Sequence, residues 1–201
     1  MLLYPEAQGK AQRALDSVLH GRFPNFGDYG KIPYIDALVH ESLRWNPIAP
    51  LGLFHALKED DEYMGYILPK GSICVGNVWA MFRDEDRYGT QVDEFIPERF
   101  LKDDGTIDQN RANTSGAFGF GRRACAGESI VRDFAWIVFA SILTAYEIVD
   151  GTDMGGQPLD QSKIEFSNDF ISSPPYIKCR FRLRPGVSES MIYNAAEEAK
   201  L

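Results

Sequence analysis

The residue best placed for chemistry is Cys125, which lies in the segment FGFGRRACAG at residues 118–127. This segment directly precedes the most apolar stretch of the chain, so the thiol stands at the predicted entrance of a helix. Backbone N–H groups and the positive end of the helix dipole favour a thiolate there. The glycines of the segment allow backbone to approach a flat ligand closely. The pattern indicates a ligand-binding thiolate, and the alternative is a structural cysteine in a glycine-rich turn.

The spacing Phe-x-x-Gly-x-Arg-x-Cys-x-Gly distinguishes these alternatives, because it resembles the heme-binding signature of the cytochrome P-450 family at every fixed position. Two further motifs occur in the family's order along the chain. Glu41-Ser42-Leu43-Arg44 resembles its helical Glu-x-x-Arg, and FIPERF at residues 95–100 resembles its Pro-Glu-Arg-Phe segment. The resemblance implies that Arg99 joins Glu41 and Arg44 in a buried ionic triad that assembles the site.

The resemblance also implies a cofactor, heme b (iron protoporphyrin IX). Cys125 is the expected axial ligand to the iron, with Phe118 shielding the sulfur, and a thiolate ligand favours cleavage of the O–O bond. Arg123 and His55 are the expected partners of the heme propionates, with an ordinary surface or core histidine as the alternative reading of His55. The other cofactor-binding positions carried over from the signature are Gly121 and Gly127. No catalytic residue is identifiable, because the chain has no Ala-Gly-x-Asp/Glu-Thr segment.

Substrate contacts are expected in two largely apolar segments, residues 48–53 and 169–172, which favours a lipophilic small molecule. The candidate contacts carried over are Ala49, Leu51, Leu53, Phe170 and Ile171. The implied activity inserts one oxygen atom from O2 into such a molecule, with electrons from an NADPH-cytochrome reductase. Four Arg and one Glu between Arg111 and Arg132 give a local charge of +3, which suits an acidic reductase. A solvated loop is the alternative reading of this basic run.

The composition argues against several other classes of protein. A formal net charge of −8 disfavours binding to nucleic acid or to anionic membranes. The cysteines at 74, 125 and 179 form no CxxC pair, so neither a disulfide framework nor a zinc ribbon is expected. No signal peptide is visible, and the longest apolar run, residues 134–146, is too short to cross a bilayer. For a full-length relative, the resemblance implies the endoplasmic reticulum membrane.

Hydrophobic periodicity around these residues predicts a mainly α chain with small β-sheets, an α+β arrangement. The predicted elements are helices at 5–19, 33–47, 79–83 and 127–149, a hairpin at 63–68, a strand at 177–184 and a polar amphipathic tail at 188–201. The helix at 127–149 is apolar around most of its circumference, so it should be deeply buried. Residues 84–116 show little periodicity, which is typical of a stretch that is functional or wrapped on something.

The chain departs from the family in length, since members are well over twice as long. We therefore expect residues 1–201 to be a single partial domain, the C-terminal part of the fold without the distal-side helices. Such a truncated form, partial gene model or fragment should not hydroxylate anything alone. The alternatives are a non-catalytic heme-binding remnant or regulatory chain, a reductase-independent heme-thiolate isomerase or dehydratase, and a structural domain without cofactor. The general texture resembles fungal microsomal members of the kind that act in secondary metabolism.

Overall fold

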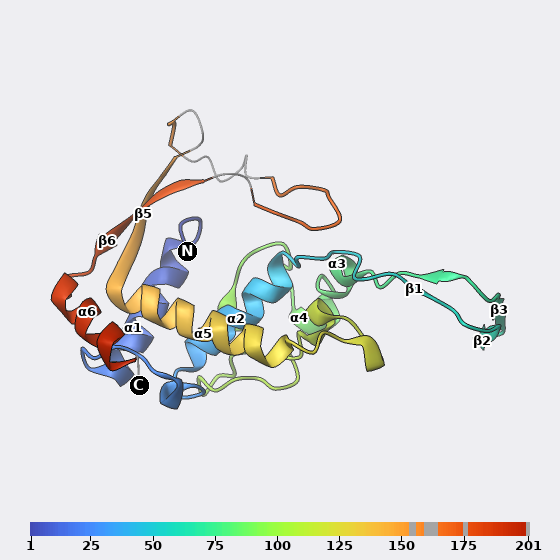
Figure 1. Cartoon of the computed structure of the whole chain (residues 1–201), viewed down its shortest axis with the longest axis horizontal. Helices are drawn as coiled ribbons and strands as arrows, with labels where there is room; N and C mark the ends of the chain where they lie inside the picture. Colours follow the sequence, from blue (N-terminus) through green and yellow to red (C-terminus); the bar gives the residue numbers. More distant parts are fainter. Residues whose placement is uncertain (153–155, 159–164, 175–176, 200–201) are drawn as a thin grey trace.

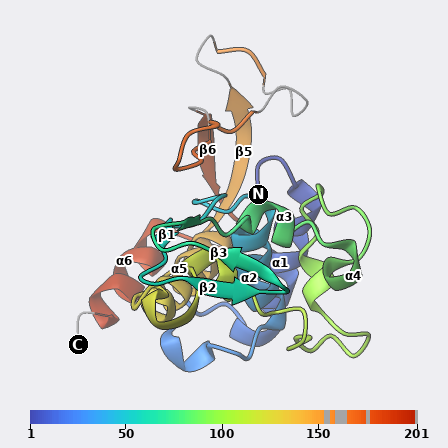
Figure 2. The ribbon, with the colours of Figure 1, turned by 90° about the vertical axis from the view of Figure 1, so that its right-hand side faces the viewer.

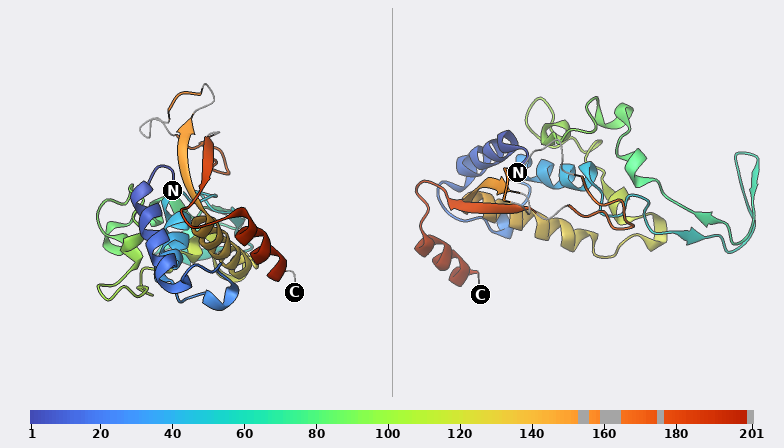
Figure 3. Two further views of the ribbon diagram at one scale, coloured as in Figure 1. Left: turned by 90° about the vertical axis from the view of Figure 1, so that its left-hand side faces the viewer. Right: turned by 90° about the horizontal axis from the view of Figure 1, so that it is seen from above.

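In the computed structural model, three helices form the centre of the molecule (Figure 1). The structure describes residues 1–152, 156–158, 165–174 and 177–199. The central helices, which contact one another pairwise, are α1 (Pro5–Leu19), α2 (Pro33–Trp45) and α5 (Glu128–Ala145). Figure 3 shows the same three helices from the side and from above. Their shared core is where most of the fully buried apolar side chains lie.

The sequence explains where α1 and α2 begin and which faces they bury. Each starts with a proline, whose missing N–H costs nothing in the first turn of a helix. In α1, Ala7, Ala11 and Leu15 are buried at four-residue intervals, so one stripe faces the core. The helix ends at His20, which adopts a left-handed conformation with φ of 49°. The predicted helices at 5–19 and 33–47 are confirmed, the second ending two residues early.

The prediction for residues 127–149 is only partly right. The helix α5 ends at Ala145, and the chain continues as strand β5 (Tyr146–Thr152), which pairs antiparallel with β6 (Lys178–Leu183). Cross-strand pairs such as Ile148 with Phe181 stabilise this ladder, and the helical pattern could not anticipate a distant partner. The expected deep burial is wrong for the first half of α5, where Ile130 is 71% and Phe134 66% exposed.

Two short antiparallel ladders follow α2 and form an arm that extends away from the helices (Figure 1); Figure 2 looks at this arm from its tip. Strands β1 (His55–Ala56) and β4 (Ile73–Cys74) pair at its base, and β2 (Asp61–Tyr63) and β3 (Tyr66–Leu68) pair at its tip. The connecting residues Met64 and Gly65 both have positive φ, 51° and 83°, as a tight two-residue hairpin requires. The predicted hairpin is therefore confirmed.

The irregular stretch at residues 84–116 wraps around a second, smaller core. It contains α4 (Glu85–Tyr88) and a 3₁₀ turn, Pro97–Phe100, and it follows the short helix α3 (Val78–Met81). The side chains buried in this core are Ala37, Val78, Phe82, Tyr88, Phe100 and Ala112. Ala37 comes from α2, so the stretch is packed onto the central helices, as its lack of periodicity predicted.

The remaining helix, α6 (Glu189–Glu198), is capped by Ser188, whose hydroxyl accepts a hydrogen bond from the N–H of Met191 at 3.3 Å. It corresponds to the predicted amphipathic tail. With these elements the α+β class with small sheets is confirmed. Among the helices of the described residues, none has both the length and the apolar character that a bilayer crossing requires.

The central core predicts a large cost for shortening Leu15, which is 0% exposed. Leu15→Ala should lower the free energy of unfolding by about 2–5 kcal/mol, because a cavity remains between α1 and its neighbours. Tyr193→Ala on α6, where the side chain is 70% exposed, should stay within about 0.5 kcal/mol of the parent. Urea denaturation of the three proteins measures both values, and equal losses would contradict this description of the core.

Candidate functional site

Cys125 lies in a tight turn, residues 119–127, between a 3₁₀ segment that ends at Phe118 and the start of α5. We call this segment the Cys turn. The N–H of Cys125 donates to the carbonyl of Phe118 at 2.8 Å, which closes the turn. Gly121 has φ of 61°, in the left-handed region where a side chain would be strained. Gly127 is the residue before α5, and a Cβ added there would lie 3.6 Å from the sulfur. The turn therefore presents an exposed thiol at the beginning of an eighteen-residue helix.

Large exposed apolar side chains flank this thiol in the sequence. Phe120 in the turn is 44% exposed, and Ile130 and Phe134, one helical turn apart on α5, are still more exposed. Large apolar side chains gathered on one exposed face mark a binding surface more often than a solvated one. The face combines a soft metal ligand, the thiol, with flat aromatic and aliphatic groups.

A cavity of about 440 Å³ opens beside the Cys turn, and both His55 and Arg123 line it. The β1–β4 ladder brings His55 there, with Cys74 as its cross-strand partner. Nδ1 of His55 lies 2.9 Å from the carbonyl oxygen of Leu53. The structure thus brings together an imidazole and a guanidinium that are far apart in the sequence. These groups fit a flat apolar cofactor with anionic substituents, the shape and charge of heme.

Gly76, two residues after the end of β4, also lines this cavity. A Cβ at Gly76 would lie 2.7 Å from Cε2 of the Phe120 ring, so only glycine lets the ring lie against the strand end. The sequence offered no signal for this contact, because the two residues belong to different motifs.

Glu41, Arg44 and Arg99 meet in a buried ion network. Nε and Nη2 of Arg44 donate to the Glu41 carboxylate at 2.6 and 2.9 Å, and Nε of Arg99 donates to it at 3.2 Å. The N–H of Ile96 adds a fourth donor at 2.6 Å. Glu41 and Arg44 are 0% exposed and Arg99 is 7% exposed. Complete pairing of this kind is what makes a buried charge tolerable.

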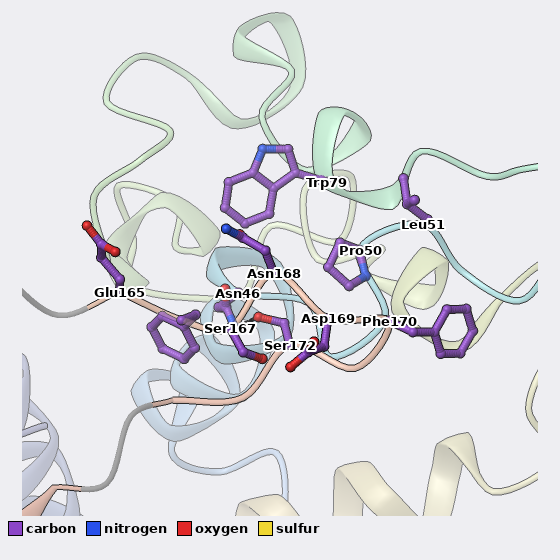
Figure 4. A pocket seen from close by; sticks show the side chains of 11 residues that line it. Asn46, Pro50, Leu51, Trp79, Glu165, Ser167, Asn168, Asp169, Phe170 and Ser172 are labelled. Carbon is purple, nitrogen blue, oxygen red and sulfur yellow. Dashed lines mark hydrogen bonds between the residues drawn. The ribbon is translucent and has the colours of Figure 1, made fainter.

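The two segments proposed for substrate contact also lie side by side. The N–H of Ser172 donates to the carbonyl of Ile48 at 2.8 Å, and the Phe54 and Phe170 rings meet edge to face at 5.7 Å. Leu51 and Phe170 line a cavity of about 710 Å³, shown in Figure 4.

The other candidate contacts lie around this cavity without lining it. Leu53 lines the cavity beside the Cys turn instead, Ala49 is half-buried, and Ile171 is 48% exposed. Trp79, which is not among the candidate contacts carried over from the sequence, forms one wall of the larger cavity (Figure 4), and the guanidinium of Arg83 stacks on its ring.

The basic run from Arg111 to Arg132 is not a uniform positive surface. Arg132 is paired with Glu128 at 2.8 Å and its side chain is only 15% exposed, while Arg111 pairs with Asp108 at 3.8 Å. Within the described part of the chain, Arg122 and Arg123 are the two arginines of the run without an ion pair. The exposed positive charge is therefore concentrated in the Cys turn. This charged region is smaller than the whole stretch from Arg111 to Arg132 that the sequence predicted.

Sequence reasoning missed a polar cluster beside the Cys turn that joins His40, Thr114 and Arg132. Arg132 donates to the Thr114 hydroxyl from two nitrogens at 3.1 Å, and Nδ1 of His40 lies 3.0 Å from the same oxygen. Burial, and next the charge of Arg132, lower the pKa of His40 to about 4. The only sequence signal was the Glu128–Arg132 spacing, which occurs on many solvated helices.

Comparison with known proteins identifies the family to which the chain is similar. The cytochrome P450 family model matches residues 1–175. The chain is 50% identical over 99% of its length to cytochrome P450 monooxygenase eriA of Hericium erinaceus. It is 43% identical over 96% of its length to cytochrome P450 monooxygenase 98 of Postia placenta, and 39% identical over 96% to monooxygenase claR of Ampulloclitocybe clavipes. The chain spans only 38%, 37% and 35% of these three fungal relatives.

The ion network predicts a strong dependence of stability on Glu41. Glu41→Gln should lower the free energy of unfolding by about 3–5 kcal/mol, because two buried arginines lose their counter-charge. Glu147→Gln serves as a control, since it removes a carboxylate that pairs with Arg182 at the surface at 2.6 Å and should cost less than about 1 kcal/mol. Chemical denaturation separates the two, and similar losses would refute the role given to the buried network.

The lowered pKa of His40 predicts a pH effect on stability. Since its folded pKa of about 4 lies below the ordinary value of 6.5, the unfolded chain binds more protons between these values. Stability should therefore fall as pH drops from 6.5 toward 4, by at most about 1.4 kcal/mol per pH unit. Asp36, whose pKa burial raises to about 6, opposes this slope. The difference between wild type and His40→Asn in urea titrations at several pH values isolates His40, and parallel curves would contradict the assignment.

Proposed function

The chain belongs to the cytochrome P450 family, and we propose that it forms the thiolate-bearing wall of the heme site in a monooxygenase that oxidises lipophilic small molecules. The observation that carries the proposal is the exposed Cys125 thiol in a glycine-shaped turn, at the start of α5 and on an apolar face. The proposed cofactor is heme b with Cys125 as the iron ligand. Phe118 shields the sulfur, while Gly121 and Gly127 shape the turn around it.

The propionates of the heme are assigned to Arg123 and His55. Both line the cavity beside the Cys turn, and a guanidinium and an imidazole are suitable partners for carboxylates. Bound through a thiolate, heme supplies the activation of dioxygen that an oxygen insertion requires. The protein's own contribution on this side is to hold the thiol, bind the propionates and cover the ring edges with apolar side chains. Glu41, Arg44 and Arg99 hold the scaffold and take no part in the chemistry.

The substrate is proposed to lie against residues 48–53 and 169–172. Leu51 and Phe170 provide apolar surface in the larger cavity, and Leu53 provides it in the cavity beside the Cys turn. Ala49 and Ile171 are proposed to add to this surface from the same two segments. This lining supports a lipophilic substrate. We place residues 1–201 within a single heme domain, because α1, α2 and α5 share one core. The groups that deliver protons to dioxygen are proposed to lie outside residues 1–201, in a full-length protein of which this chain is a part.

Electrons are proposed to come from an NADPH-cytochrome reductase that docks near the Cys turn. Arg122 is exposed there, has no ion pair within the described residues and is not assigned to a heme propionate, so an acidic partner surface is favoured. For a full-length protein we propose the endoplasmic reticulum membrane as its location. A purely heme-binding protein is the second candidate.

The thiolate assignment is tested by the absorption spectrum of the heme-loaded protein expressed from its complete gene, reduced and under carbon monoxide. The wild type should show a strongly red-shifted Soret band, because the iron carries a thiolate ligand. Cys125→Ala should lose that band, and Cys179→Ala on β6 should keep it, because Cys179 lies on the ladder remote from the Cys turn. A red-shifted band in Cys125→Ala would refute the assignment.

The same protein separates the two candidate functions. A monooxygenase oxidises a lipophilic substrate only when reductase, NADPH and O2 are all present. A protein that shows the thiolate spectrum but no reductase-dependent product would favour the heme-binding alternative.

A further inference from the structure

Arg132 contacts both ends of the turn that carries Cys125. From α5 its Nε and Nη2 donate to Oε1 of Glu128 at 3.0 and 2.8 Å. Its Nη1 and Nη2 donate to the hydroxyl of Thr114, which lies just before the 3₁₀ segment that ends at Phe118. Its guanidinium carbon lies 5.1 Å from the centre of the Phe118 ring, within the range of a cation–π contact. One side chain therefore connects the entry of the turn with the helix that follows it.

The donors and acceptors of this cluster fix its hydrogen-bond directions. A guanidinium only donates, so the Thr114 oxygen accepts from Arg132. Nδ1 of His40 lies 3.0 Å from that oxygen and 3.4 Å from Nη1 of Arg132, so it faces two possible donors and acts as an acceptor. His40 must then be neutral at Nδ1, which agrees with the direction of its pKa shift. Thr114 is 0% exposed, so water does not replace a contact that its hydroxyl loses. The cluster thus holds α2, Thr114 and α5 in one relative position.

From this geometry we propose that Arg132 is a positioning residue for Cys125. It braces Phe118 against α5, and the turn between them is closed by the 2.8 Å hydrogen bond from Cys125 N–H to the Phe118 carbonyl. With both ends braced, the direction of the thiol is set before any ligand binds. The inference rests on the proposed function, in which this thiolate binds the heme iron. It gives Arg132 an internal role, distinct from the exposed docking charge that the basic run suggested.

The test compares variants of the heme-loaded protein expressed from the complete gene. Arg132→Gln removes the fork that reaches Thr114 and Glu128 together, and the charge beside Phe118. Groups that orient a metal ligand typically contribute a factor of about 10–100 in metal affinity. We therefore expect heme affinity to fall about 10- to 100-fold, part of the red-shifted carbon monoxide band to move to the unshifted position, and the reduction potential to shift. Arg132→Lys should give intermediate values, because it keeps the charge and loses the planar fork.

The matched control is Arg182→Gln, which removes an arginine whose side chain is 65% exposed and which pairs with Glu147 across the β5–β6 ladder. All three readouts should remain at wild-type values in this control. Thr114→Val is the second variant, used in particular if Arg132→Gln does not fold, since it removes only the bridging hydroxyl. It should change the same readouts in the same direction by a smaller factor.

A readout without heme checks the positioning directly. In the heme-free protein, the alkylation rate of Cys125 by iodoacetamide, followed by peptide mass spectrometry with Cys179 as the internal reference, should change in Arg132→Gln and Thr114→Val. If either variant only loses thermal stability and keeps the wild-type spectrum, heme affinity, potential and alkylation rate, the positioning role is overturned. If Cys125→Ala retains the red-shifted band, the proposed function itself fails, independently of Arg132.

Discussion

The charge of Glu41 is completely buried, and the shape of the molecule around the Cys turn depends on how that charge is balanced. Two arginines and one backbone N–H donate to its carboxylate. The arginines have further N–H groups, and these donate to backbone carbonyls, including those of Phe82 and Val92 for Arg44 and of Tyr88 and Gln91 for Arg99. A segment without helical or strand periodicity thereby gains a definite course, because its carbonyls must point inward to the guanidinium groups.

The rigidity given by this network extends to the thiol through α2. His40, the residue before Glu41, contacts the Phe100 ring at 5.4 Å on one side and the Thr114 hydroxyl on the other. The Thr114 and Arg132 contacts then lead to Phe118 and to the beginning of α5. The ion network and the polar cluster occupy successive positions on one helix, so the irregular stretch and the Cys turn are fixed to the same support.

The exposed apolar side chains of α5 indicate where a ligand could bind, as its buried side chains indicate where the core lies. From Trp136 onward, α5 packs Trp136, Ala140 and Leu143 into the core, whereas its first two turns expose the large apolar side chains Ile130 and Phe134. Apolar surface in water is unfavourable, by roughly 25 cal/mol for each Å². A flat apolar cofactor over the Cys turn would remove part of this surface from water, which agrees with the proposed heme site. The exposure of apolar side chains therefore decreases along this one helix, from its start beside the Cys turn to its buried end.

The sequence alone determined the elements whose signals are local. The proline-started helices, the hairpin around residues 63–68 and the glycine-shaped segment around Cys125 follow from short-range sterics and periodicity, and the ordered motifs indicated the family. The tertiary structure decided what depends on distant partners: the strand that begins at Tyr146 because β6 pairs with it, the exposure of Ile130, and the meeting of His55 with Arg123 in one cavity. It also decided that Arg132 faces inward, because a guanidinium binds wherever suitable acceptors converge, and Thr114 and Glu128 converge only in the folded chain.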